Sequence, residues 1–196
     1  MKQLYCTLLL LALSGAYLYA ESGVDALEQM TSTNLVKRQQ ASQFLIQQQK
    51  EFEKKLTSIV DGAFPKEIIF DAAKVLGQNK SETAAASLAK KIGLDVQGRS
   101  LMTLITDEEV HPISTALVKI GIPSIPAVIR NLAESDDAKV RELSLEVLYR
   151  IERDKDIVQL RLQKALAAEK DLQKQARLQS ALKALAEISL RFSGQL

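Results

Sequence analysis

The spacing of apolar residues constrains this chain more than any other feature of its sequence. Over most of the chain, apolar side chains recur at steps of three, four and seven residues, as one face of an α-helix requires. Phe52, Leu56 and Ile59 show the spacing. Strand-like alternation is confined to residues 68–70 and 101–105, and the first of these lies inside a helical pattern. The sequence therefore predicts an all-α protein.

The helical pattern also repeats along the chain. A small residue three positions before an apolar pair occurs at Ala41, Ala72 and Ser144, and would let helices approach closely. A helix pair of about 30–40 residues cannot bury its apolar face alone, so neighbouring pairs must stack on one another. The apolar pairs contain marker leucines separated by 31, 41 and 31 residues, namely Leu45, Leu76, Leu117 and Leu148.

Glycine and proline residues divide the pattern into helices. Turns are predicted at Gly62 to Pro65, at Gly77 to Ser81 and at Gly121. The predicted elements form one domain over residues 24–191, with an irregular insertion at about 93–108. They are a lead helix (24–30), one long or two kinked helices (34–60), three pairs (66–77 with 81–92, 110–120 with 124–133, 138–153 with 157–169) and a capping helix (172–191).

Two stretches of the chain resemble HEAT repeats and the related HEAT-like repeats of bacterial proteins. One runs from Asp137 through Arg141 to Leu148 and Ile151. The other covers residues 116–132, where glycine and proline fall at the turn between two helices. The resemblance covers residues 109–190 well and residues 34–92 loosely, and the family's Asp and Arg are missing from the copies at 68–76 and 112–120.

This resemblance implies a fold and a type of function. The fold is a short α-solenoid, an α-α superhelix of stacked antiparallel helix pairs. Proteins of this kind usually serve protein–protein contact, although the resemblance itself does not imply a partner. We predict that the partner of this chain is a protein. Asp137 and Arg141 match the family's Asp and Arg, which usually bridge repeats, and we interpret both as structural.

The first twenty residues have the layout of a secretory signal peptide. Lys2 supplies the positive start, an apolar run covers residues 8–13, and small residues follow. Cleavage is predicted after Ala16 or Ala20, which would make the protein periplasmic or secreted. The alternative is an uncleaved anchor helix, because residues 3–20 are uncharged over a length that just spans a bilayer.

The composition restricts the chemistry that is possible. Cys6 is the only cysteine and lies in the cleaved segment, so the mature chain would contain no disulfide or thiolate site. The net charge of +2 comes from interspersed basic and acidic residues, which is not the pattern of a nucleic-acid-binding protein. The sequence has no glycine-rich phosphate loop. We therefore predict no cofactor.

The single histidine is the strongest candidate for a chemical site. His111 follows Asp107, Glu108 and Glu109, and Pro112 comes next. One histidine without a second one or a cysteine lacks the ligand spacing of a zinc site, so we interpret the cluster as the acidic first turn of a helix. The carboxylate pairs at 108–109 and 136–137 are likewise interpreted as helix caps. No catalytic, cofactor-binding or metal-binding residue is predicted.

Two surfaces remain as candidates for binding. The amphipathic stretch at 39–55 could form a seam with a partner helix, but packing on the next helix pair is the favoured interpretation. By resemblance, Arg130, Asn131, Arg161 and Lys164 would lie near a concave face, although ordinary solvent-exposed charge is favoured there too.

The favoured function is a non-enzymatic protein-interaction or scaffold module of the cell envelope or secreted fraction. It would contact no nucleic acid, and no membrane unless residues 1–20 are retained. That case, a membrane-tethered scaffold, is the first alternative. A metal-dependent enzyme that uses the loop from Asp107 to His111 is the less favoured one.

Overall fold

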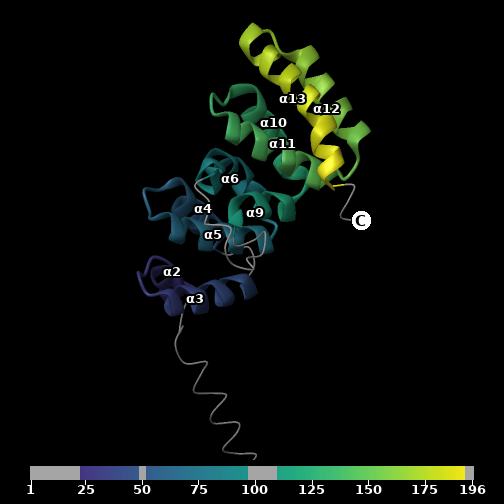
Figure 1. Cartoon of the computed structure of the whole chain (residues 1–196). Helices are drawn as coiled ribbons and strands as arrows, with labels where there is room; N and C mark the ends of the chain where they lie inside the picture. Colours follow the sequence, from purple (N-terminus) through teal and green to yellow (C-terminus); the bar gives the residue numbers. More distant parts are fainter. Residues whose placement is uncertain (1–22, 49–51, 97–109, 193–196) are drawn as a thin grey trace, which may run out of the picture.

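The computed structural model describes residues 23–48, 52–96 and 110–192, and this part of the chain is helical without a strand (Figure 1). The prediction of an all-α protein is confirmed. The helices are α2 (Gly23–Met30), α3 (Leu35–Gln47), α4 (Glu53–Asp61), α5 (Lys66–Gln78), η1 (Glu82–Ala84), α6 (Ala85–Lys91), α7 (Gly93–Val96), α9 (Pro112–Ile120), η2 (Ile122–Ser124), α10 (Ile125–Glu134), α11 (Ala138–Glu152), α12 (Lys155–Ala168) and α13 (Leu172–Phe192).

The helices pack largely in the order in which they occur in the chain. One row consists of α3, α5, α9 and α11, each of which contacts the next. A second row consists of α4, α6, α10 and α13, again with successive contacts. Figure 1 shows the result, with α2 and α3 at one end and α12 and α13 at the other. The predicted capping helix α13 packs against α10, α11 and α12.

The repeated apolar pattern identifies the core correctly. All four marker leucines are fully buried, and so are Ala41, Ala72 and Ser144 (the leucines are Leu45, Leu76, Leu117 and Leu148). The segment at 34–60 forms two helices, α3 and α4, and its apolar stripe faces inward because Leu45 and Phe52 are both buried. This burial is what the favoured interpretation of that stretch predicts.

A hydrogen-bonded brace precedes α11. The Asp137 carboxylate accepts from the backbone N–H of Lys139 and caps the helix. The Ser135 hydroxyl accepts from the N–H of Asp137, and the Arg141 guanidinium donates to the carbonyl oxygens of Ser135 and Asp136 at 2.8 and 2.9 Å. Asp137 and Arg141 are therefore structural, but they hold the loop before their own helix instead of bridging repeats.

The same brace precedes α3. Asn34 caps the helix, the Ser32 hydroxyl accepts from the N–H of Asn34, and Arg38 donates to the carbonyl oxygens of Ser32 and Thr33. Each group sits at the same distance along the chain from its arginine as its counterpart before α11. Arg38 additionally donates to Asp71 of α5 at 2.8 Å, so here the arginine does join two layers.

Gly77 has a different role from the predicted one. It lies inside α5 and packs against α9, while the turn itself falls at Lys80, whose φ is 50°. A Cβ added at Gly77 would lie 2.7 Å from the Cα of Ala116 and 2.8 Å from its Cβ. The absence of a side chain at Gly77 is therefore what lets α5 and α9 pack this closely.

Replacing Gly77 with alanine is expected to destabilise the protein by about 1–3 kcal/mol, the usual cost of overpacking. This loss opposes the gain of about 1 kcal/mol that alanine brings to a helix interior. Gly93→Ala is the control, because its Cβ would meet only a side-chain methyl of Val140 at 3.4 Å. Urea unfolding of both variants measures the difference, and equal stabilities would contradict the close packing at Gly77.

The predicted irregular insertion begins differently from the expectation. Residues Gly93–Val96 form the short helix α7, so the prediction of irregular backbone is wrong there. The remainder of the insertion lies outside the described residues. As for membrane crossing, no single helix in the described ranges is both long and apolar enough, and α9 with residues 122–134 meets those criteria only as a pair bent by 116°.

Candidate functional site

An open groove of about 620 Å³ runs between α3 and α5. Its α3 side is formed by residues three or four positions apart, from Leu35 to Ile46, and its α5 side extends from Glu67 to Gln78. The groove therefore follows almost the whole length of both helices, and Pro112 at the start of α9 contributes at one point. Such an elongated shape suits an elongated ligand.

The ion pair between Arg38 and Asp71 belongs to this groove and holds its two helices together. Arg38 Nε donates to Asp71 Oδ2 at 2.8 Å, and the two side chains are only 9% and 16% exposed. Two further hydrogen bonds from Arg38 Nη1 to backbone carbonyl groups fix the guanidinium. The groove thus has a rigid polar element between flanking apolar side chains, among them Leu35 and Phe70.

The remaining polar groups that line the groove are mostly uncharged. The amides of Gln39, Gln43 and Gln78 each offer donors and an acceptor, which match the alternating N–H and C=O groups of a peptide backbone. Lys74 and Glu67 balance each other in charge, as do Arg38 and Asp71. The charges of the lining therefore cancel, and its other polar groups are uncharged.

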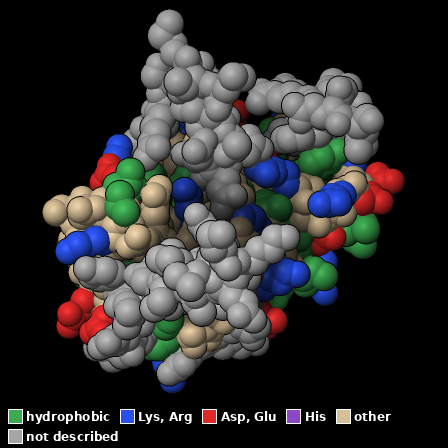
Figure 2. All heavy atoms as spheres, turned by 90° about the horizontal axis from the view of Figure 1, so that it is seen from below, with side chains coloured by type: hydrophobic (Ala, Val, Ile, Leu, Met, Phe, Trp, Pro, Cys, Tyr) green, Lys and Arg blue, Asp and Glu red, His purple; other side chains and the backbone are tan. Residues whose placement is uncertain are grey.

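Charge elsewhere on the surface is mixed as well. Figure 2 looks at the molecule from the end formed by α2 and α3, and basic and acidic side chains are interspersed over the described part of that face. This distribution agrees with the interspersed charges of the sequence.

The candidate chemical site around His111 is only partly described. Asp107, Glu108 and Glu109 lie outside the described residues, so their prediction as a helix cap stays a prediction. His111 itself is the N-cap residue of α9, but its side chain makes no capping hydrogen bond. Its Nδ1 is buried and has no hydrogen-bond partner among the described residues.

The carboxylate that caps α9 comes from Asp95 of α7, which sequence analysis did not single out. Asp95 accepts from the N–H of Ile113 at 3.3 Å and from both the N–H and the hydroxyl of Ser114 at 2.7 Å. Its side chain is buried, and this burial raises the pKa of the Asp95 carboxyl, although the hydrogen bonds from Ser114 and Ile113 act in the opposite direction. No local sequence signal connects residues so far apart.

Asp95 gives the stability of the protein a specific pH dependence. Burial raises the folded-state pKa of Asp95, so the protonated carboxyl is favoured in the folded protein. The stability that this preference contributes is complete below the unfolded pKa of about 3.9, and it is lost as the pH rises through the folded pKa. We expect Asp95→Asn to remove this dependence. Wild type should thus lose stability relative to the variant between pH 4 and pH 7, as measured by urea unfolding at both values. A stability difference independent of pH would contradict the assignment.

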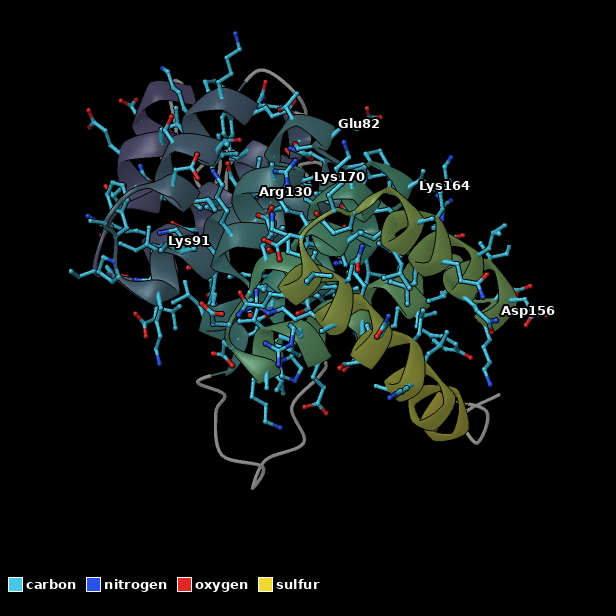
Figure 3. All side chains as sticks on the ribbon, turned by 90° about the horizontal axis from the view of Figure 1, so that it is seen from above. Glu82, Lys91, Arg130, Asp156, Lys164 and Lys170 are labelled. Carbon is cyan, nitrogen blue, oxygen red and sulfur yellow. The ribbon has the colours of Figure 1, made fainter. Side chains whose placement is uncertain are left out.

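The four polar residues predicted near a concave face divide into two kinds. Asn131 donates to the carbonyl oxygen of Ala89 at the end of α6, at 2.7 Å, and Arg161 pairs with Glu152 of α11. Arg130 and Lys164 are exposed and make no ion pair with any described residue (Figure 3). Asn131 and Arg161 therefore serve as ties between helices.

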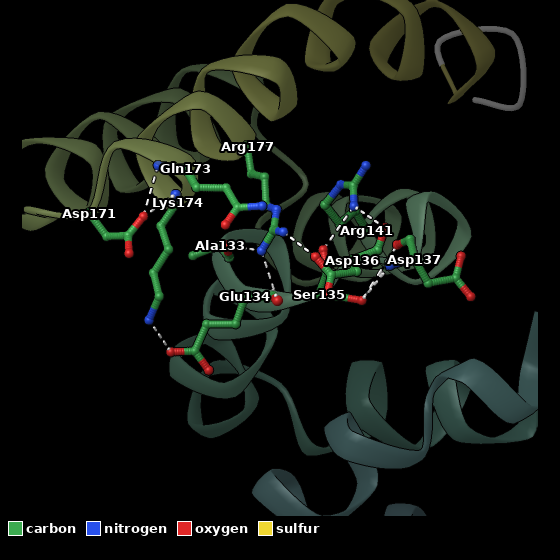
Figure 4. A network of polar contacts seen from close by, with 10 residues as sticks. All are labelled: Ala133, Glu134, Ser135, Asp136, Asp137, Arg141, Asp171, Gln173, Lys174 and Arg177. Carbon is green, nitrogen blue, oxygen red and sulfur yellow. Dashed lines mark hydrogen bonds and ion pairs between the residues drawn. The ribbon is translucent and has the colours of Figure 1, made fainter.

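The carboxylate pair at 136–137 belongs to a network around the end of α10 (Figure 4). Arg177 of α13 donates to the carbonyl oxygens of Ala133 and Glu134 and forms an ion pair with Asp136. Lys174 pairs with Glu134 at 2.7 Å. The predicted helix cap is confirmed for Asp137, whereas Asp136 instead forms the ion pair with Arg177.

Comparisons with known proteins add no relative. No family model, no curated protein and no solved structure matches this chain. Among the residues that the structure describes, no three His, Cys, Asp or Glu side chains are grouped so that they could hold a metal ion.

Proposed function

We propose that this protein is a non-enzymatic interaction module, and that the groove between α3 and α5 receives a segment of a protein partner. The observation that carries this proposal is the shape and lining of the groove. It follows two helices for most of their length, and its lining combines apolar side chains and amides with a fixed ion pair. These are the properties that an extended peptide of low net charge requires.

The architecture proposed for the module is a short HEAT-like α-solenoid. The support comes from the two rows of helices that contact in succession and from the equivalent braces at Arg38 and Arg141. Stacked repeats contact mainly their neighbours, and a stack of this kind provides extended binding surfaces. The groove lies on the row containing α3 and α5, and not on α10 and α12, which carry the four residues predicted near a concave face.

A site-specific photo-crosslinker tests the groove directly. Placed at Gln43, the probe should form a covalent adduct with one recurring protein when the full chain is expressed in its host. Gln179 on α13, an exposed glutamine away from the groove, is the matched control position. Leu35→Asp in the groove should reduce the Gln43 adduct several-fold. Adducts that are equal at both positions, or that persist unchanged in Leu35→Asp, would refute the proposal.

We further propose that the module acts outside the cytoplasm, after cleavage at Ala16 or Ala20. The support is the signal-like sequence of residues 1–20. The alternative keeps these residues and makes the protein a membrane-tethered scaffold. Cell fractionation followed by intact-mass measurement separates the two, because a cleaved species must lack residues 1–16 or 1–20 and an anchored one must retain them.

A further inference from the structure

Helix α12 presents an apolar stripe to solvent at the end of the stack. Val158 and Leu162 are its fully buried side chains, and they face α11 and α13. On the opposite side of the helix, Leu160 is 65% exposed and Ile157 is 42% exposed. Terminal repeats of stacked proteins usually turn a polar face outward, whereas this outer face has a leucine at its centre.

Opposite charges flank this leucine symmetrically. Asp156 lies four residues before Leu160 and Lys164 lies four residues after it, so all three side chains occupy one face of the helix. Both charged side chains are exposed, and neither makes an ion pair or side-chain hydrogen bond with any described residue. Figure 3 shows Asp156 and Lys164 along the outer edge of α12, away from the other helices.

We propose that this face of α12 binds the same face of a second copy of the chain, with the two helices antiparallel and a two-fold axis at Leu160. A two-fold axis brings each residue before Leu160 opposite the residue equally far after it. Leu160 then packs against its own copy, and Asp156 of each chain faces Lys164 of the other. The face is thus complementary to itself in charge.

This self-complementarity is what identifies a second copy as the occupant. A parallel arrangement would bring Asp156 opposite Asp156 and Lys164 opposite Lys164, which repel. In the antiparallel arrangement both ion pairs form at once around an apolar centre. A helix of 14 residues spans about 21 Å. An interface of this length buries at most about 1,200 Å², the low end of the range for specific interfaces. We therefore expect dimerisation to depend on protein concentration.

Cysteine cross-linking tests the geometry in the full chain. In a Cys6→Ser background, Leu160→Cys should give a disulfide-linked dimer on oxidation, because residues on the axis meet. A disulfide requires Cα atoms within about 7 Å of each other. Asp156→Cys or Lys164→Cys alone should therefore give little disulfide-linked dimer, because neither position faces its own copy. A co-expressed mixture of the two variants should cross-link, because position 156 of one chain faces position 164 of the other. Val36→Cys, 59% exposed on α3, is the matched control. A Leu160→Cys yield no higher than that of Val36→Cys overturns the proposal, as does cross-linking only to other proteins.

Charge exchange tests the pairing independently. In the Leu160→Cys chain, Asp156→Lys should reduce the dimer yield several-fold, because like charges then face each other. Adding Lys164→Asp to the same chain should restore the yield, since both ion pairs re-form with reversed polarity. All positions are exposed, and circular dichroism verifies that each variant folds. A double variant that remains as weak as the single one overturns the antiparallel arrangement.

Discussion

Leu148→Ala is expected to lower the free energy of unfolding by about 2–5 kcal/mol, the range observed for large-to-small substitutions in protein cores. Leu148 is completely buried in α11, within the same core as the other marker leucines. Alanine removes apolar area from the core and leaves a cavity, and the surrounding helices are held by contacts on several sides, so they can close it only in part.

Urea unfolding of the wild type and the variant measures this change. Leu172→Ala is the matched control, because Leu172 is 81% exposed at the start of α13 and its loss should change stability by less than about 0.5 kcal/mol. A change of that small size for Leu148→Ala as well would mean that the repeat register, which places Leu148 with Leu45, Leu76 and Leu117, is wrong.

Arg38→Ala is expected to cost about 3 kcal/mol, at the lower end of the values for breaking a buried ion pair. The substitution leaves Asp71 with an uncompensated charge in a site where it is only 16% exposed. It also removes the donor to two backbone carbonyl groups before α3. The lower end of the range applies because the groove admits some water to both groups.

Two control variants separate the parts of this effect. Arg141→Ala removes the equivalent brace before α11, where the arginine makes no ion pair with another layer in the described part of the chain. It should therefore cost only the net value of its hydrogen bonds, about 1 kcal/mol. Arg130→Ala removes an exposed arginine that makes no ion pair among the described residues, and should be nearly neutral. If Arg38→Ala proved no more costly than Arg141→Ala, the ion pair with Asp71 would contribute nothing to stability.

The two arginines also show how one local pattern serves different purposes. Arg38 and Arg141 make the same hydrogen bonds to the loop before their own helices, because those bonds depend only on spacing along the chain. Among the described residues, Arg38 pairs with an acidic side chain of the adjacent layer, and Arg141 does not. In the C-terminal half, the tie to Asp136 comes instead from Arg177 of α13.

Local sequence is sufficient to predict the helices of this protein and the residues that form its core. Helical periodicity and turn residues act over a few positions, so α5, α10 and α11 begin and end within two residues of the predicted bounds. The burial of Leu45 and Leu148 follows from the same periodicity, because a helix has only one apolar face to bury.

The contacts between helices, in contrast, follow from the three-dimensional packing. The sequence pattern predicts a turn at Gly77, whereas in the structure its missing side chain allows Ala116 of α9 to pack closely against α5. Asp95 caps a helix that begins 17 residues later, and Asn131 caps the end of α6 across the stack. These contacts, like the groove between α3 and α5 and the solvent exposure of Leu160, depend on how helices are placed in three dimensions. That placement is set by the packing of the whole core, which no short stretch of sequence encodes.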